Sequence, residues 1–164
     1  WSSHENFVKG QVKEMFGATP MYESLEIAFQ TISTEKKTSD LSRPIILFIV
    51  SDGEPTDATP SEIIKISNRI KELGVIIIST LITNENVTNY KTLYSFEESS
   101  WDSATKLMFQ CASILPKKSP FYSHLIEFNW SFEDNPKLFT QVNQSETLEE
   151  FLKLILSPLE DKNY

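Results

Sequence analysis

The chain has 164 residues, of which 40% are apolar, so it is long enough to form one domain of ordinary size around a buried core. Its formal net charge of −8 argues against a nucleic-acid interface, because such an interface needs a basic stripe. A single cysteine, Cys111, excludes an intramolecular disulfide framework and a cysteine-based zinc site, and no apolar run approaches the roughly 20 residues of a membrane span.

The N-terminal part of the chain reads as two helices. The sequence starts at Trp1 without an initiator methionine or a signal-peptide pattern, so we interpret it as a segment of a longer chain. A capping box and apolar residues at helical spacing predict a first helix over residues 2–16. A second apolar stripe over residues 21–32 predicts another helix, with Thr19 as its N-cap and Pro20 as its first residue.

The most informative stretch is PIILFIVSDGEPTD, residues 44–57, which follows a polar loop over residues 35–43. Six consecutive apolar residues, 45–50, predict a strand that is buried on both faces, as in a parallel sheet. The turn residues that follow place the carboxylate of Asp52 at the carboxyl edge of that sheet. Ligands of open α/β sheets bind at this edge, so we interpret the acidic loop as a candidate site.

A helix and a second buried strand follow. The sequence Thr59-Pro60-Ser61-Glu62 combines a capping box with proline at the first helical position, and Gly74 is expected to end this helix. The run VIIISTL, residues 75–81, is again apolar and uncharged. Strand, helix and strand in this order predict two parallel strands joined by a right-handed crossover.

The later part of the chain is less regular. Residues 83–100 are polar and predict a loop, after which Asp102 is expected to cap a helix that ends near Ala112. Residues 114–137 read as an irregular insertion whose aromatic side chains cover an edge of the core. Within it, residues 125–128 predict a short strand.

The chain is expected to close with a third parallel strand over residues 138–142 and a last helix. That helix is capped by Ser145 or Thr147 and ended by Pro158. The whole pattern predicts an α/β fold with a mainly parallel sheet between two layers of helices, a three-layer αβα arrangement of the Rossmann-like kind.

On these residues the chain resembles a von Willebrand factor A-type domain. The stretch Gly17-Ala18-Thr19-Pro20 before a helix, and IILFIVSDGEPTD before a helix and VIIISTL, are similar to the second and third metal-binding loops of that family. A closing strand followed by Ser145-Glu146-Thr147-Leu148 and a terminal helix also fits the family. The resemblance covers about residues 7–156, and it implies a single domain of this type over residues 1–164.

The resemblance implies a metal-ion-dependent adhesion site. Thr19 would be the threonine ligand and Asp52 the aspartate ligand of one Mg²⁺ or Mn²⁺ ion, and an acidic side chain of a protein partner would complete the coordination shell. The implied function is that of a non-enzymatic protein-binding module. Oxygen ligands of this kind suit hard divalent cations, which in the case of Mg²⁺ also keep several waters.

The chain departs from the family pattern at one point. The D-x-S-x-S motif that ends the family's first, central strand does not occur in the sequence, and by the resemblance it would lie before Trp1. We therefore expect a partial domain, incomplete at its N-terminal side. Its strand at residues 45–50 would keep an unpaired edge, and the chain on its own would aggregate.

Two other functional interpretations remain open from the residues alone. Asp52 could be the phospho-acceptor or Mg²⁺ ligand of a signalling or enzyme domain, since a receiver domain also places an aspartate at the end of a strand. Alternatively, the domain could be purely structural and hold no metal. His4 and His124 have no neighbours at ligand spacing and are interpreted as ordinary surface residues.

Overall fold

The computed structural model describes residues 19–38, 45–87, 89–115 and 121–160, with the backbone alone for residues 154–160. The helix predicted over residues 2–16 lies outside this part of the chain. The described elements, in order, are α2 (Met21–Thr38), β1 (Ile46–Ser51), α3 (Pro60–Glu72), β2 (Ile76–Ile82), β3 (Thr92–Leu93), α4 (Ser103–Cys111), α5 (Phe121–Glu127), β4 (Ser131–Phe132), β5 (Phe139–Val142) and α6 (Ser145–Glu160).

The main sheet has three parallel strands in the order β1-β2-β5. In the register, Phe48 of β1 lies opposite Ile78 of β2, and Ser79 of β2 lies opposite Phe139 of β5. All three strands were predicted within one residue of their observed bounds, and their parallel pairing is confirmed. The α/β fold class is therefore the one that the sequence predicts.

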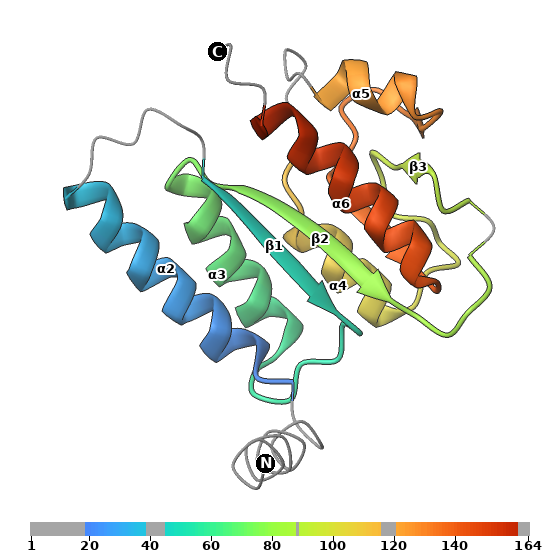
Figure 1. Ribbon diagram of the computed structural model, residues 1–164. Coiled ribbons are helices and arrows are strands. Elements are labelled where there is room, and N and C mark those ends of the chain that lie inside the picture. Colours follow the sequence, from blue (N-terminus) through green and yellow to red (C-terminus); the bar gives the residue numbers. More distant parts are fainter. Residues whose placement is uncertain (1–18, 39–44, 88, 116–120, 161–164) are drawn as a thin grey trace, which may run out of the picture.

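Helices cover both faces of this sheet (Figure 1). On one face α2, α3 and α4 pack around Ile49, Ile77 and Phe139. On the other face Ile78 and Leu138 contact a second cluster, which includes Phe151 of α6 and residues of α5. Since neighbouring residues of a strand point to opposite faces, Ile77 and Ile78 belong to different clusters, and the arrangement has three layers.

Two helix starts form as their sequences predict. The Thr59 hydroxyl accepts the Glu62 N–H, and the Glu62 carboxylate accepts the Thr59 N–H at 2.8 Å, which is a complete capping box. At the start of α4 the Asp102 carboxylate accepts the Thr105 N–H at 2.7 Å, and hydrogen bonding to the Thr105 side chain and backbone lowers the pKa of Asp102. The start of each of these helices is therefore specified by a capping residue close to its first turn.

Three predicted elements differ from the structure. The strand predicted at residues 125–128 is wrong, because Leu125 lies in α5 and is buried there. Strand pairing in this region is made instead by β3 and β4, two residues each. The loop predicted from residue 35 is shorter than expected, since α2 continues to Thr38, and α6 continues past Pro158 to Glu160.

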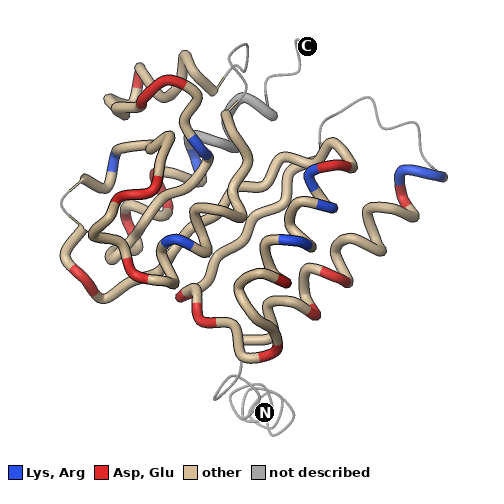
Figure 2. The backbone as a smooth tube through the Cα atoms, turned by 180° about the vertical axis from the view of Figure 1, so that it is seen from behind, with Lys and Arg blue, Asp and Glu red and all other residues tan. Residues whose placement is uncertain are grey.

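The first turns of α2 and α3 are acidic, and their last turns are rich in basic residues, together with Glu35 and Glu72. At the carboxyl edge, α2 and α3 start with Glu23 and Glu62 in their first turns. At the amino edge, their last turns carry the basic residues Lys36, Lys37, Arg69 and Lys71. Figure 2 shows these basic segments toward the far ends of the two helices. Each arrangement favours its helix, because the helix dipole attracts anions at the start and cations at the end.

None of the helices in the described part of the chain is long and apolar enough to cross a membrane.

Candidate functional site

The loop after β1 is a tight turn at the carboxyl edge of the sheet. The Ser51 hydroxyl accepts the Gly53 N–H at 3.1 Å, and the Asp52 carboxylate accepts the Glu54 N–H through Oδ1 at 3.3 Å. Gly53 has a φ of 78°, in the region that glycine enters without strain. A Cβ atom at this position would lie 2.9 Å from the Cβ and the carbonyl oxygen of Ala104, so the turn also packs closely on the start of α4.

Two reciprocal hydrogen bonds fasten this loop to the start of α2. The Thr19 N–H donates to the Thr56 hydroxyl at 2.8 Å, and the Thr56 N–H donates to the Thr19 carbonyl at 3.1 Å. The segment just before α2 and the loop that carries Asp52 are therefore held together, although Thr19 and Thr56 are 37 positions apart in the sequence.

Asp57 extends the same connection by capping α2 from outside the helix. Its two carboxylate oxygens accept the N–H groups of Tyr22 and Glu23 at 3.1 and 2.9 Å. Burial by itself would raise the pKa of Asp57, but the hydrogen bonds from Glu23 and Tyr22 outweigh it and lower the pKa from its ordinary value. The local cap predicted at Thr19 is therefore not what binds these two amides, which an acid from a distant loop satisfies instead.

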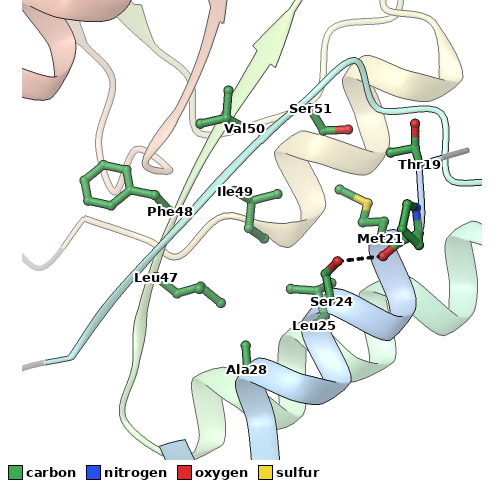
Figure 3. Close-up of a pocket in the computed structure, with 11 residues that line it drawn as sticks. Thr19, Met21, Ser24, Leu25, Ala28, Leu47, Phe48, Ile49, Val50 and Ser51 are labelled. Atoms are coloured by element: carbon green, nitrogen blue, oxygen red, sulfur yellow. Dashed lines mark hydrogen bonds between the residues drawn. The ribbon is translucent and has the colours of Figure 1, made fainter. Parts of the chain in front are cut away.

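An apolar cavity of about 230 Å³ lies between α2 and β1. Figure 3 shows Leu47 and Ile49 pointing toward α2, where they face Leu25 and Ala28. Phe48 also lines the cavity but points away from α2. These apolar walls offer van der Waals contact, and none of the residues that line the cavity is charged.

The cavity becomes polar at its carboxyl-edge end, where Thr19 and Ser51 line it. There the Ser24 hydroxyl donates to the Pro20 carbonyl at 2.8 Å (Figure 3). This end offers hydroxyl groups close to the loop that carries Asp52.

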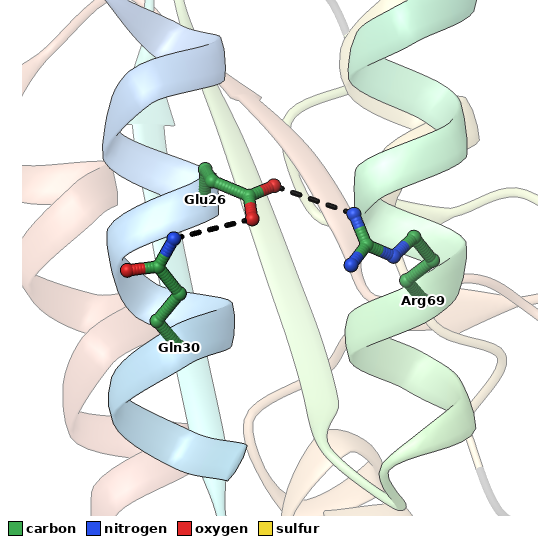
Figure 4. A network of polar contacts seen from close by, with 3 residues as sticks. All are labelled: Glu26, Gln30 and Arg69. Atoms are coloured by element: carbon green, nitrogen blue, oxygen red, sulfur yellow. Dashed lines mark hydrogen bonds and ion pairs between the residues drawn. The ribbon is translucent and has the colours of Figure 1, made fainter. Parts of the chain in front are cut away.

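An ion pair connects α2 to α3. Oε2 of Glu26 on α2 lies 3.3 Å from the Arg69 guanidinium on α3, and the Gln30 amide donates to Oε1 of the same carboxylate at 3.4 Å (Figure 4). The guanidinium also lies 4.1 Å above the ring centroid of Phe29. Such a stacked arginine is held in one orientation, which makes the bridge between the helices more rigid than a lone surface ion pair.

The structure brings both sequence-predicted metal ligands to the same edge of the sheet. Thr19 hydrogen-bonds to the loop that contains Asp52, and Ser51, the residue before Asp52, lines the same cavity end as Thr19. Their hydroxyl and carboxylate oxygens are hard donors, as Mg²⁺ and Mn²⁺ require. Within the described ranges, however, no three acidic, histidine or cysteine side chains gather closely enough to hold a metal ion. In the described residues, this edge therefore offers hydroxyl and carboxylate oxygens without a clustered set of acidic ligands.

Two residues of this edge were not predicted. Asp57 and Thr56 were recognised only as part of an acidic loop, whereas the structure shows them fastening that loop to α2. No local sequence pattern could have paired Thr56 and Asp57 with residues 19–23, because those residues lie at the start of α2, far away in the sequence.

No protein-family model matches the sequence, and a search of curated proteins finds no match. Among solved structures, the chain is similar to a crystal structure of the manganese-loaded TRAP protein of Plasmodium vivax, with 13% sequence identity and a TM-score of 0.46. The similarity covers 89% of this chain and 44% of that chain, so this chain spans less than half the length of the protein it matches. At this level of similarity, the function has to be argued from the residues of the chain itself.

Proposed function

We propose that the chain is a non-enzymatic protein-binding module of the von Willebrand factor A type. In this proposal Thr19 and Asp52 bind a divalent cation, Mg²⁺ or Mn²⁺, at the carboxyl edge of the sheet, and an acidic side chain of the partner completes the shell. The cation would supply a positive centre that attracts a carboxylate to an otherwise acidic edge.

The observation that carries the proposal is the connection between Thr19 and the loop after β1. A threonine and an aspartate from distant segments are useful as joint ligands only if the fold holds their segments side by side. The reciprocal hydrogen bonds of Thr19 and Thr56 do this, and they use only the backbone of Thr19, while the Glu54 N–H uses only Oδ1 of Asp52.

The test is a titration of the full chain with Mn²⁺, in which the free ion is followed by electron paramagnetic resonance. We expect saturable binding to the native chain. The isosteric substitutions Asp52→Asn and Thr19→Val should each weaken it about tenfold or more, as is usual when a group of a metal site is removed.

Glu54→Gln is the matched control, because it removes the same charge from the same loop at an exposed position. We expect it to change the affinity by no more than about twofold. Equal losses in Asp52→Asn and Glu54→Gln would mean that the acidic edge attracts ions diffusely. That result, or no saturable binding by the native chain, would contradict the proposal.

A further inference from the structure

Two lysines converge at the amino edge of the sheet, the edge opposite the candidate metal site. Lys71 lies in the last turn of α3 and Lys137 lies just before β5, and both side chains are partly buried. The Lys71 ammonium donates to the Gln110 carbonyl at 3.3 Å. The Lys137 ammonium donates to the same carbonyl at 3.4 Å and to the Phe109 carbonyl at 3.1 Å.

These contacts limit the distance between the Nζ atoms of Lys71 and Lys137. Because both Nζ atoms lie within hydrogen-bond distance of one oxygen atom, they can be no more than about 7 Å apart. The Lys137 ammonium also lies 4.6 Å above the ring centroid of Phe109, which limits its movement. The structure thus holds the two cations within about 7 Å of each other.

The two charges are poorly compensated. The ion pairs of the described residues involve Arg69, Lys91, His124 and Lys153, and none of them joins Lys71 or Lys137 to a carboxylate. The carbonyl groups at the end of α4 supply only the partial negative charge of a helix C-terminus.

The pKa values of both amines reflect this environment. Burial lowers the pKa of Lys71 and of Lys137, and the charge of Lys71 lowers the pKa of Lys137 further. The nearby Cys111 acts in the opposite direction on both amines, and Glu97 does so on Lys137.

An open cavity of about 580 Å³ lies next to the pair, and both lysines line it. Asn68 and Ser113 add polar groups to its wall, although the Ser113 hydroxyl already accepts the Ile77 N–H at 2.9 Å. Glu72 also lines the cavity and is the one acidic side chain among its lining residues. The cavity is large enough for a small anion, and Glu72 would oppose its binding.

We propose that Lys71 and Lys137 together bind a dianionic oxyanion of the phosphate class, either free phosphate or a phosphomonoester. One dianion compensates both ammonium charges. Two of its oxygens, each accepting a charge-assisted hydrogen bond of about 2.8 Å, bridge ammonium groups at this separation. The site is independent of the candidate metal site and lies at the other edge of the sheet.

The test is a titration of the full chain, with its lysine side chains labelled for NMR, against inorganic phosphate at constant ionic strength. At pH 8 a phosphomonoester is dianionic, since its second pKa is about 6. We expect saturable shifts of the Lys71 and Lys137 Cε signals and little change at Lys65, which is exposed on the same helix as Lys71. Bound phosphate stabilises the charged amines, so the pKa of both should rise on saturation.

Substitutions sharpen the test. Lys71→Gln and Lys137→Gln should each weaken phosphate binding about tenfold, whereas Lys65→Gln should leave it within about twofold and Glu72→Gln should strengthen it. A parallel titration with O-phosphoserine distinguishes the sources: tighter binding than inorganic phosphate indicates a phosphorylated side chain, and weaker or equal binding indicates the free ion. Shifts of all lysines without saturation, or an equal loss in Lys65→Gln, would overturn the proposal.

Discussion

Gly53 occupies a position where two constraints coincide. Its φ of 78° is costly for any residue with a Cβ, and that Cβ would also lie 2.9 Å from Ala104 of α4. We expect Gly53→Ala to lower the free energy of unfolding by about 1–2 kcal/mol for the backbone conformation alone, and by more once α4 is displaced. Urea unfolding followed by circular dichroism measures the loss.

Gly74→Ala is the matched control for this prediction. Gly74 has nearly the same φ, 76°, but the nearest atom to its added Cβ is the Lys36 Nζ at 3.5 Å, an ordinary contact. It should therefore show the backbone cost without the clash. If both substitutions cost the same, the close packing of the turn on α4 contributes nothing to stability.

Asp57 makes the folding stability of the chain depend on pH. Its pKa is lowered in the folded chain, so its contribution to stability is complete above the ordinary value of 3.8 and is lost as the pH falls through the folded value. We expect Asp57→Asn to destabilise the chain by about 0.5–2 kcal/mol at neutral pH, which is the range for loss of a helix cap.

The check is the difference in unfolding free energy between the native chain and Asp57→Asn across pH 2–7. It should shrink as the pH falls below about 4, because Asp57 of the unfolded chain then binds a proton first, and it should reach its minimum once the folded carboxyl is protonated as well. Glu54→Gln, in the same loop, serves as the comparison for a charge that caps no helix. A difference that stays constant down to pH 2 would contradict the role of the ionised carboxylate.

At the scale of elements, Phe151 joins α6 to the rest of the fold. Its ring is fully buried, and its centroid lies 5.1 Å from that of the Trp130 ring. Both residues belong to the cluster that covers the second face of the sheet. Phe151→Ala should lower the free energy of unfolding by about 3–5 kcal/mol, the usual cost of emptying such a site. Phe96→Ala removes the same atoms from a side chain that is 80% exposed and should change stability by less than about 0.5 kcal/mol. Similar losses in both would show that this second cluster is not tightly packed.

The elements that the sequence predicts well are those whose signals are local. The three strands of the main sheet are apolar runs bounded by turn residues, and the starts of α3 and α4 carry their own caps. The strand predicted at residues 125–128 failed because a short apolar run fits a strand or a buried helix equally well. Packing against α6 and the sheet decides for the helix there.

The same distinction explains what could be predicted of the candidate site. A carboxylate at the end of a buried strand is visible in the sequence, and the resemblance paired Asp52 with Thr19. The role of Asp57 is not visible, because its partners are backbone amides 34 and 35 residues earlier. Likewise, the Lys36 ammonium in the last turns of α2 donates to the Leu73 carbonyl. Local helix propensity cannot predict this long-range contact.

At the scale of the whole molecule, β1 is one of the two edge strands of the described three-stranded sheet. In the described residues it pairs only with β2, it carries no charged residue, and its Val50 is 45% exposed. Natural sheets protect such edges with lysine, proline or a bulge. We therefore expect the chain to self-associate on its own. Val50→Lys should reduce this association, as measured by size-exclusion chromatography with light scattering.

Ile82→Lys is the control, since Ile82 is 49% exposed but belongs to the middle strand β2. It removes a similar apolar surface and leaves the free edge unchanged, so it should reduce association less than Val50→Lys. A native chain that elutes as a monomer and unfolds in one cooperative transition would contradict the prediction. If Val50→Lys is monomeric, it provides the background in which the unfolding measurements described above are made.

The fastening of the loop after β1 also determines how the chain would respond to mechanical tension. A pull on Asp52 along the axis of β1 is carried partly by that strand. The hydrogen bonds between β1 and β2 are then loaded in shear and have to break together. The remainder passes through the bonds of Thr19, Thr56 and Asp57 into α2, which the Glu26–Arg69 bridge ties to α3. Tension applied at the loop is thus distributed over a strand and two helices, so the loop cannot be peeled away from the fold by breaking one bond at a time.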